Sequence, residues 1–215
     1  MFGALITADD GTSFITDEST PISLQGVYTK EGSSKVTQTI TVNSEDVVLP
    51  FCVSTWNTFF SYNITGQTLT VNAFATSGDS SVFSFTCYVF TTRAQPIPKW
   101  GVAIWDTKGK CILTNETKVL TDIITVGQRG GANSGLNINQ TLPGKIAILP
   151  DIAGFWVGVY MQRPIQIGLA MGARFDGKNT TIAPVASSAP PSGAQMGAPL
   201  DSKVSVRAID VSRYE

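Results

Sequence analysis

The sequence of 215 residues contains no histidine. Histidine is the commonest general base and metal ligand, so its absence excludes a Ser-His-Asp triad, a Cys-His pair and a histidine-ligated metal. Carboxylates are present, but they fall in turns or before strands, without the apolar surroundings that separate two pKa values. A calcium loop of alternating acidic residues is also missing. We therefore expect no enzymatic activity, no cofactor and no bound metal.

Charged side chains are scarce, at 14% of the residues, and 15 basic side chains nearly balance 16 acidic ones. The formal net charge of -1 gives no electrostatic reason to expect nucleic acid or an anionic membrane surface as a partner. No run reaches the roughly 18 apolar residues of a membrane-spanning helix. The N-terminus reaches Asp9 before any apolar run of signal-peptide length. We expect a chain made and retained in a cytoplasm, with no nucleic-acid partner and no membrane insertion.

Cysteine is sparse and odd in number, and Cys52, Cys87 and Cys111 match no zinc or redox spacing. We expect buried, reduced thiols that act as small apolar side chains. A bridge between Cys52 and Cys87 is the alternative.

An internal repeat organises the chain. Residues 2–6, which begin Phe2-Gly3, lie over residues 100–104, which begin Trp100-Gly101, at an offset of 98 (100 minus 2). A second block, at an offset of 100, compares Val48, Leu49, Pro50 and Trp56 with Ile148, Leu149, Pro150 and Trp156. Two nearly equal offsets indicate an internal duplication. A duplication predicts that the two halves of the chain share one fold.

The period of the apolar residues is two within each repeat, as in half-buried strands with a threonine-rich outer face. Short strands separated by turn signals predict an all-β protein, with two tandem antiparallel β-sandwiches of Ig-like or Greek-key type. The sandwiches are expected at 1–94 and 100–215, joined by a proline-containing linker at 95–99. Each repeat should open with a hairpin, closed by Gly11 and by Gly109. Further strands are expected near residues 22–29, 36–42, 47–53, 58–62, 68–74, 82–90, 119–126, 146–149, 155–161, 165–175 and 204–211.

The second repeat contains an excess of small residues and prolines at about residues 178–201. Long loops in compact domains are usually either functional or disordered. Two interpretations stay open, a flexible loop and an arm that orders on a partner subunit. The candidate interface residues of this loop are Pro184, Pro190, Pro191, Gln195, Met196 and Pro199.

The four tryptophans divide into two groups. Trp56 and Trp156 occupy matched positions, which favours core anchors over two identical ligand sites; Trp100 is expected to pack in the core where Phe2 does. Trp105 lies over a threonine that suits a solvent face, so it is the candidate for an exposed contact.

The openings of both repeats share an aromatic-Gly-aliphatic-x-Ile run followed by a glycine-closed turn, carried by Phe2, Gly3, Ile6 and Gly11 and by Trp100, Gly101, Ile104, Asp106 and Gly109. This pattern resembles the start of small β-sandwich domains in minor tail and tail-tip proteins of tailed bacteriophages. The resemblance implies a non-enzymatic virion protein of the tail tip, fibre or baseplate, which packs against copies of itself and other tail proteins.

Two other functions stay open. A carbohydrate-binding adhesin module would use Trp105 or an exposed tyrosine to stack on a host surface glycan. A capsid decoration protein would share every sequence property named above.

Overall fold

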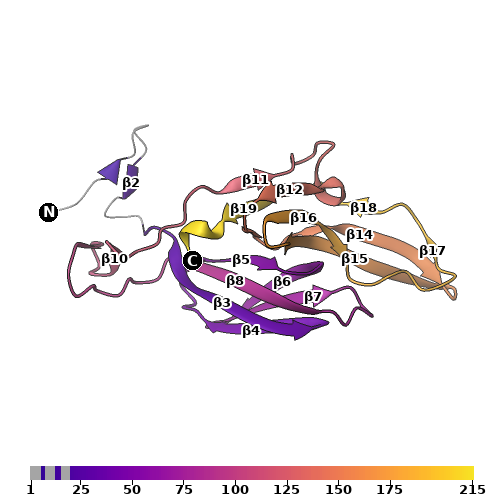
Figure 1. Ribbon diagram of the computed structural model, residues 1–215, viewed down its shortest axis with the longest axis horizontal. Helices are drawn as coiled ribbons and strands as arrows, with labels where there is room; N and C mark the ends of the chain where they lie inside the picture. The colour runs from indigo at the N-terminus through magenta and orange to yellow at the C-terminus, as the bar shows by residue number, and fades with distance from the viewer. Residues whose placement is uncertain (1–5, 8–12, 16–19) are drawn as a thin grey trace.

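The computed structural model describes residues 6–7, 13–15 and 20–215, and it confirms the all-β fold (Figure 1). The helical segments of the described residues are two single 3-10 turns, η1 (Gly135–Asn137) and η2 (Val211–Arg213). The strands are β1 (Ile6–Thr7), β2 (Ser13–Ile15), β3 (Ser23–Ser33), β4 (Lys35–Thr41), β5 (Val48–Ser54), β6 (Thr58–Thr65), β7 (Thr68–Ala75), β8 (Val82–Thr91), β9 (Ala103–Trp105), β10 (Cys111–Thr114), β11 (Ile124–Val126), β12 (Gln140–Pro143), β13 (Ile146–Ile148), β14 (Ile152–Tyr160), β15 (Arg163–Phe175), β16 (Asn179–Ala186), β17 (Gln195–Met196), β18 (Leu200–Asp201) and β19 (Val206–Asp210).

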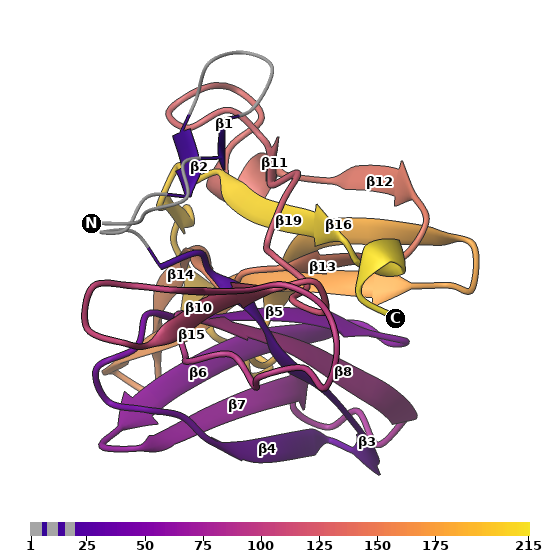
Figure 2. The same cartoon turned by 90° about the vertical axis from the view of Figure 1, so that its left-hand side faces the viewer.

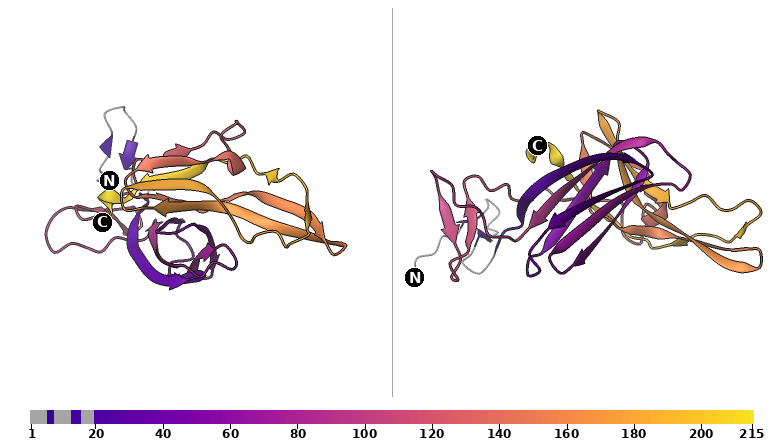
Figure 3. Two further views of the ribbon diagram at one scale, coloured as in Figure 1. Left: turned by 45° about the vertical axis from the view of Figure 1, so that its right-hand side comes forward. Right: turned by 90° about the horizontal axis from the view of Figure 1, so that it is seen from below.

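The first half of the chain folds into two antiparallel layers, one with strand order β3-β8-β5 and one with order β4-β7-β6. Figure 3 shows this half end-on as a rounded sandwich. In β4 the side chains of Val36 and Ile40 are buried, while the threonines between them face outward or are half-buried. The period-two pattern of the sequence therefore selects the buried face, because alternate side chains of a strand point to opposite sides.

The second half repeats the same order of pairing. Strands β11-β19-β13 correspond to β3-β8-β5, and β12-β16-β15 correspond to β4-β7-β6, again antiparallel throughout. Strand β14 is an addition that pairs with β15, and β17 and β18 pair in turn with β14.

The hairpins that open the two halves also match. In β1–β2, Ile6 lies opposite Ile15 and Thr7 opposite Ser13. In β9–β10, Ile104 lies opposite Leu113 and Trp105 opposite Cys111, and both hairpins have a register shift at this point. The common pairing order and the common hairpin register support a duplication, which itself stays a prediction.

The second block of the sequence repeat has no such counterpart in the fold. Val48 begins β5, whereas Ile148 ends β13. Trp56 lies in the turn between β5 and β6, whereas Trp156 lies within the added strand β14. The matched residues of this block therefore occupy different structural positions.

The two halves share one hydrophobic core instead of packing as separate sandwiches on a linker. Cys52 of β5 pairs with Ile148 of β13, which makes the sheet continuous across the halves. The rings of Phe90 and Tyr214 meet edge to face with centroids 4.8 Å apart. Gln95, at the start of the expected linker, is buried, and its side-chain amide donates a hydrogen bond to the Ser23 hydroxyl at 2.8 Å. The expected boundary at 95–99 thus separates two sequence halves within one core.

The expected loop at 178–201 is in part a strand, which corrects the sequence interpretation. Strand β16 pairs with β15 over residues 180–186 and with β12 over residues 179–182. Pro184 lies just beyond the β12 pairing, so its missing N–H interrupts no hydrogen bond to that strand. The irregular part of the segment begins after Ala186.

All three cysteines are buried and reduced. Cys52 and Cys87 lie directly opposite each other on β5 and β8, with their sulfur atoms 3.9 Å apart. Burial raises the pKa of the Cys52 thiol well above its ordinary value, which favours the unreactive protonated form. The thiols thus act as apolar core groups, and the alternative Cys52–Cys87 bridge is not formed.

The molecule is long, and two hairpins extend from its ends. The β9–β10 hairpin lies at one end, and the long β14–β15 hairpin extends past the sandwich at the other (Figure 1). In the end-on view of Figure 2 the β9–β10 hairpin faces the viewer, in front of the strands of the shared core.

Candidate interaction surfaces

Exposed large apolar side chains gather at both ends of the molecule. One group belongs to the β9–β10 hairpin and the residues before it, 97–116, here called the tryptophan hairpin. The other belongs to β14–β15 and the short strands beside it, here called the projecting hairpin. The exposed apolar residues are Ile97, Trp100, Val102 and Trp105 in the first group, and Ile152, Val157, Val159, Met161 and Leu200 in the second.

A glycine and an asparagine set the conformation of the tryptophan hairpin. Gly101 has a φ of 124°, and a Cβ there would lie 2.0 Å from the side-chain oxygen of Asn115. The same oxygen accepts a hydrogen bond from the backbone N–H of Val102 at 3.1 Å. Only glycine fits this contact, and the neighbouring Trp100 is directed to solvent with 80% of its surface exposed.

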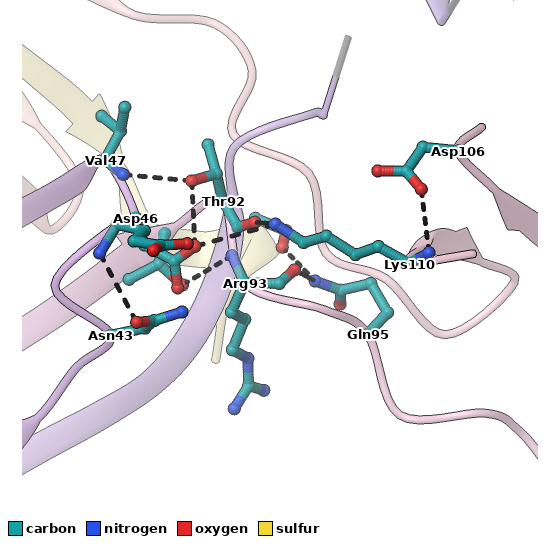
Figure 4. A network of polar contacts seen from close by, with 11 residues as sticks. Asn43, Asp46, Val47, Thr92, Arg93, Gln95, Asp106 and Lys110 are labelled. Carbon is teal, nitrogen blue, oxygen red and sulfur yellow. Dashed lines mark hydrogen bonds and ion pairs between the residues drawn. The ribbon is translucent and has the colours of Figure 1, made fainter. Parts of the chain in front are cut away.

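A polar network fixes the base of this hairpin to the sandwich (Figure 4). The Lys110 ammonium donates to the carbonyl of Thr92 at 2.6 Å and lies 3.7 Å from the buried Asp46 carboxylate. The hydroxyl of Thr92 accepts from the Val47 backbone N–H at 3.0 Å. Asp106 closes the hairpin turn by accepting the backbone N–H of Lys110 at 2.8 Å. The exposed end is therefore held in a fixed place by contacts at its base.

The projecting hairpin exposes one row of apolar side chains. Phe155, Val157 and Val159 alternate along β14 and so share a face, and Leu200 of β18 lies opposite Phe155 in register. Val157, Val159 and Leu200 are exposed, and Phe155 is half-buried. An apolar row of this kind on a segment that leaves the core marks an interaction surface.

The turn at the tip of this hairpin is strained. Met161 and Gln162 both have positive φ angles, 49° and 61°, between the paired residues Tyr160 and Arg163. Two-residue hairpin turns with two positive φ angles favour asparagine and glycine, because other residues lose free energy in this conformation. The turn presents the Met161 side chain at 75% exposure. Strain retained at an exposed tip is a pointer to function.

Residues 187–205, here called the arm, lie along β14. Backbone N–H groups of Gly197 and Ser202 donate to the carbonyls of Val157 and Ala153, each at 2.9 Å. The Asp201 carboxylate accepts from the backbone N–H of Leu136 at 3.1 Å. The arm thus orders on its own chain through backbone contacts, and it covers the sheet edge that β14 would otherwise expose.

The candidate interface residues of the sequence occupy different places in this arrangement. Trp105 is exposed, as expected. Pro184 is half-buried inside β16, away from the irregular part of the arm, which corrects its expected place in a loop. The remaining residues lie on the arm, with Met196 half-buried and Pro190, Pro191, Gln195 and Pro199 exposed.

Two of the expected core anchors are at the surface. Trp100 is exposed and precedes Gly101, whose positive φ and contact with Asn115 set the backbone at this point. Trp56 is 37% exposed and donates its indole N–H to the Asp79 carboxylate at 2.7 Å. This bond is the main cause that lowers the pKa of Asp79. The turn position of Trp56 explains the error, since side chains in a surface turn point away from the core.

The other two expected anchors have different outcomes. Trp156 is half-buried on β14, opposite the buried Ile167 of β15. Phe2 lies outside the described residues.

Sequence reasoning missed the exposed row of β14 and the Met161 tip. Residues 155–161 are apolar or glycine at every position and have no alternation from which an exposed face could be read. The turn also lacks asparagine and glycine, which are the usual signals of a hairpin. The available signal was a continuous run of apolar residues and glycine over 155–161, which is followed by the polar Gln162 and the charged Arg163.

Within the described part of the chain, no group of three or more Cys, Asp or Glu side chains could hold a metal ion. No helix among the described residues has the length and apolar character that crossing a bilayer requires. Comparisons of the chain with family models, curated proteins and solved structures found no match.

Proposed function

We propose that this chain is a non-enzymatic structural protein of a tailed-bacteriophage virion, in the minor tail, tail tip, baseplate or fibre attachment. It would act by packing against copies of itself and other virion proteins. The observation that carries this proposal is the projecting hairpin, whose exposed apolar row at Val157, Val159 and Leu200 ends in the exposed Met161.

Free energy considerations favour a covered state for this hairpin. Apolar surface removed from water contributes about 25 cal/mol per Å², and methionine adapts its shape to varied partner surfaces. The projecting part of β14 and β15, with the short strand β17 paired beside it, has little core of its own and gains most from a neighbouring subunit that packs on its apolar face. When several copies pack together, the contributions of many modest contacts would add up to a stable assembly.

The low charge of the chain supports the same proposal. Charged residues are depleted at the centres of protein interfaces, and only 14% of this sequence is charged. The resemblance carried by Phe2, Gly3, Trp100 and Gly101 supports a phage tail as the place of assembly.

The test uses the full chain, tagged and produced in cells infected by a phage that carries its gene. Particles are purified on a density gradient, and mass spectrometry measures the copy number of the chain in them. We expect several copies per particle for the wild type and a several-fold loss for Val159→Ser combined with Met161→Ser. Val82→Ser changes another exposed apolar residue, 73% exposed on the sandwich, and should leave incorporation unchanged.

The proposal fails if the wild-type chain is missing from purified particles and remains a monomer at all concentrations in light scattering. Its location by electron microscopy separates a tail component from a capsid decoration protein. The exposure of Trp105 favours one other candidate, a carbohydrate-binding adhesin, which a glycan array would detect.

A further inference from the structure

The tryptophan hairpin has a combination of side chains that the packing role leaves unused. Trp100 and Trp105 are exposed at 80% and 48%, and Ile97 and Val102 beside them are also exposed. Indole rings on an exposed tip combine an apolar body with an N–H donor, which suits a boundary between an apolar medium and water.

Basic side chains accompany these apolar groups. Lys99 and Lys108 are exposed, one beside Trp100 and one in the turn after Trp105. Lys110 is committed to Thr92 and Asp46 at the base of the hairpin. The Asp106 carboxylate in the same turn accepts two backbone N–H bonds, from Lys108 and Lys110. The net charge of the whole chain is close to zero. The tryptophan hairpin exposes two lysines, Lys99 and Lys108, next to its tryptophans in the sequence, and one glutamate, Glu116, at its C-terminal end.

These features fit a lipid surface better than a sugar. A sugar site needs planar polar groups beside its aromatic platform to bind hydroxyls. Here the Asp106 carboxylate and the Asn115 side-chain oxygen already accept backbone N–H bonds of the hairpin itself. Ile97 and Val102 add aliphatic surface, which a sugar's hydroxyls do not need.

The same features fit a lipid surface better than a protein groove. Lysine is depleted in protein interfaces, because its hydrated ammonium loses water there without a fixed partner. At a bilayer the lysine stem lies along apolar surface while the ammonium reaches the headgroup phosphates.

We infer that the tryptophan hairpin docks on a lipid bilayer that contains anionic headgroups. The two indoles enter the headgroup region together with Ile97 and Val102, and Lys99 and Lys108 bind phosphates beside them. The docking is peripheral, and the strands of the core stay outside the bilayer. This inference does not rest on the proposed packing role, since it uses the opposite end of the molecule.

The experiment measures binding of the full chain to vesicles of phosphatidylcholine, alone or mixed with phosphatidylglycerol, by flotation and by tryptophan fluorescence. We expect flotation with the mixed vesicles and a shift of the emission to shorter wavelength, both weakened by added salt. Trp100→Ser with Trp105→Ser should abolish flotation. Lys99→Gln and Lys108→Gln should each weaken it about fivefold.

Val82→Ser is the matched control, an exposed apolar residue at the far end of β8 from the hairpin, and it should bind as the wild type does. Since the substituted residues are exposed, circular dichroism should show an unchanged fold for each variant. No flotation with either vesicle overturns the inference. Equal binding of vesicles by the wild type and the double tryptophan variant overturns it as well. So does a chain that does not bind vesicles but binds glycans on an array in a way that requires Trp105.

Discussion

The hydroxyl of Tyr88 donates a 2.8 Å hydrogen bond to the side-chain carboxylate of Glu215, which joins the centre of β8 to the end of the described chain. Lys145 forms an ion pair with the same carboxylate at 2.5 Å and lies over the Tyr88 ring. The three side chains come from both halves of the sequence. They therefore close the shared core at the side where η2 follows β19.

Removal of the Tyr88 hydroxyl tests this contact. Tyr88→Phe keeps the buried ring and leaves Glu215 paired with Lys145, so the free energy of unfolding should fall by about 1 kcal/mol. Urea denaturation followed by fluorescence measures the change. Tyr62→Phe, on a partly exposed ring of β6, is the control and should shift the free energy by less than about 0.5 kcal/mol. Equal effects of the two substitutions would contradict a stabilising role for the bond.

Acid should destabilise the protein through three carboxylates. The pKa of Glu215 is lowered by Lys145, that of Asp79 by Trp56, and that of Asp176 by the backbone N–H groups at the start of β16. A folded pKa below the unfolded one means that the unfolded state binds more protons. The stability that these carboxylates contribute is therefore fully present above their ordinary pKa values, 4.5 for glutamate and 3.8 for aspartate. It is lost as the pH falls through the lower pKa values of the folded state.

Asp176→Asn should therefore reduce the sensitivity to acid. The variant retains an oxygen that accepts from the N–H groups of Lys178 and Asn179, but it has no charge to lose. Thermal melts at neutral pH and near pH 3 should show a smaller drop of Tm for the variant than for the wild type. A drop of the same size would mean that Asp176 does not contribute to acid unfolding.

The sequence predicted the strands of the sandwich well, because the apolar period of two in segments such as β4 and β7 directly records which face is buried. The glycine-closed turn at Gly109 was also predicted, and its φ of 78° requires the freedom of glycine. Strand β16 was missed, since Pro184 and its small residues resemble a loop until two neighbouring strands satisfy the backbone.

The interaction surfaces were predicted less well than the strands. Trp105 was expected to be exposed, and it is. Trp100 was expected in the core because Phe2 stands at the matched position. Its neighbour Gly101 has a positive φ and contacts Asn115 on the other side of the hairpin, and the comparison with Phe2 does not reveal this contact.

The position of the arm should depend on two glycines of β14. A Cβ at Gly154 would lie 2.3 Å from the carbonyl oxygen of Leu200, and one at Gly158 would lie 2.5 Å from that of Gln195. Gly154→Ala and Gly158→Ala should each displace the arm, because backbone oxygens at these distances must move. Limited proteolysis should then cleave within residues 187–205 several-fold faster than in the wild type. Gly168→Ala, where the nearest atom is the Ser187 hydroxyl at 3.9 Å, should leave the rate unchanged.

The strained tip of the projecting hairpin offers a test that separates stability from assembly. Met161→Asn combined with Gln162→Gly places the residues favoured at positive φ into the turn, so the free energy of unfolding should rise by about 1 kcal/mol. The same change removes the exposed methionine, so incorporation into particles should fall if Met161 contacts a neighbour. Gln162→Gly alone relieves part of the strain and keeps Met161, and it should raise stability without loss of incorporation. A double variant that is more stable and assembles as the wild type does would remove Met161 from the interface.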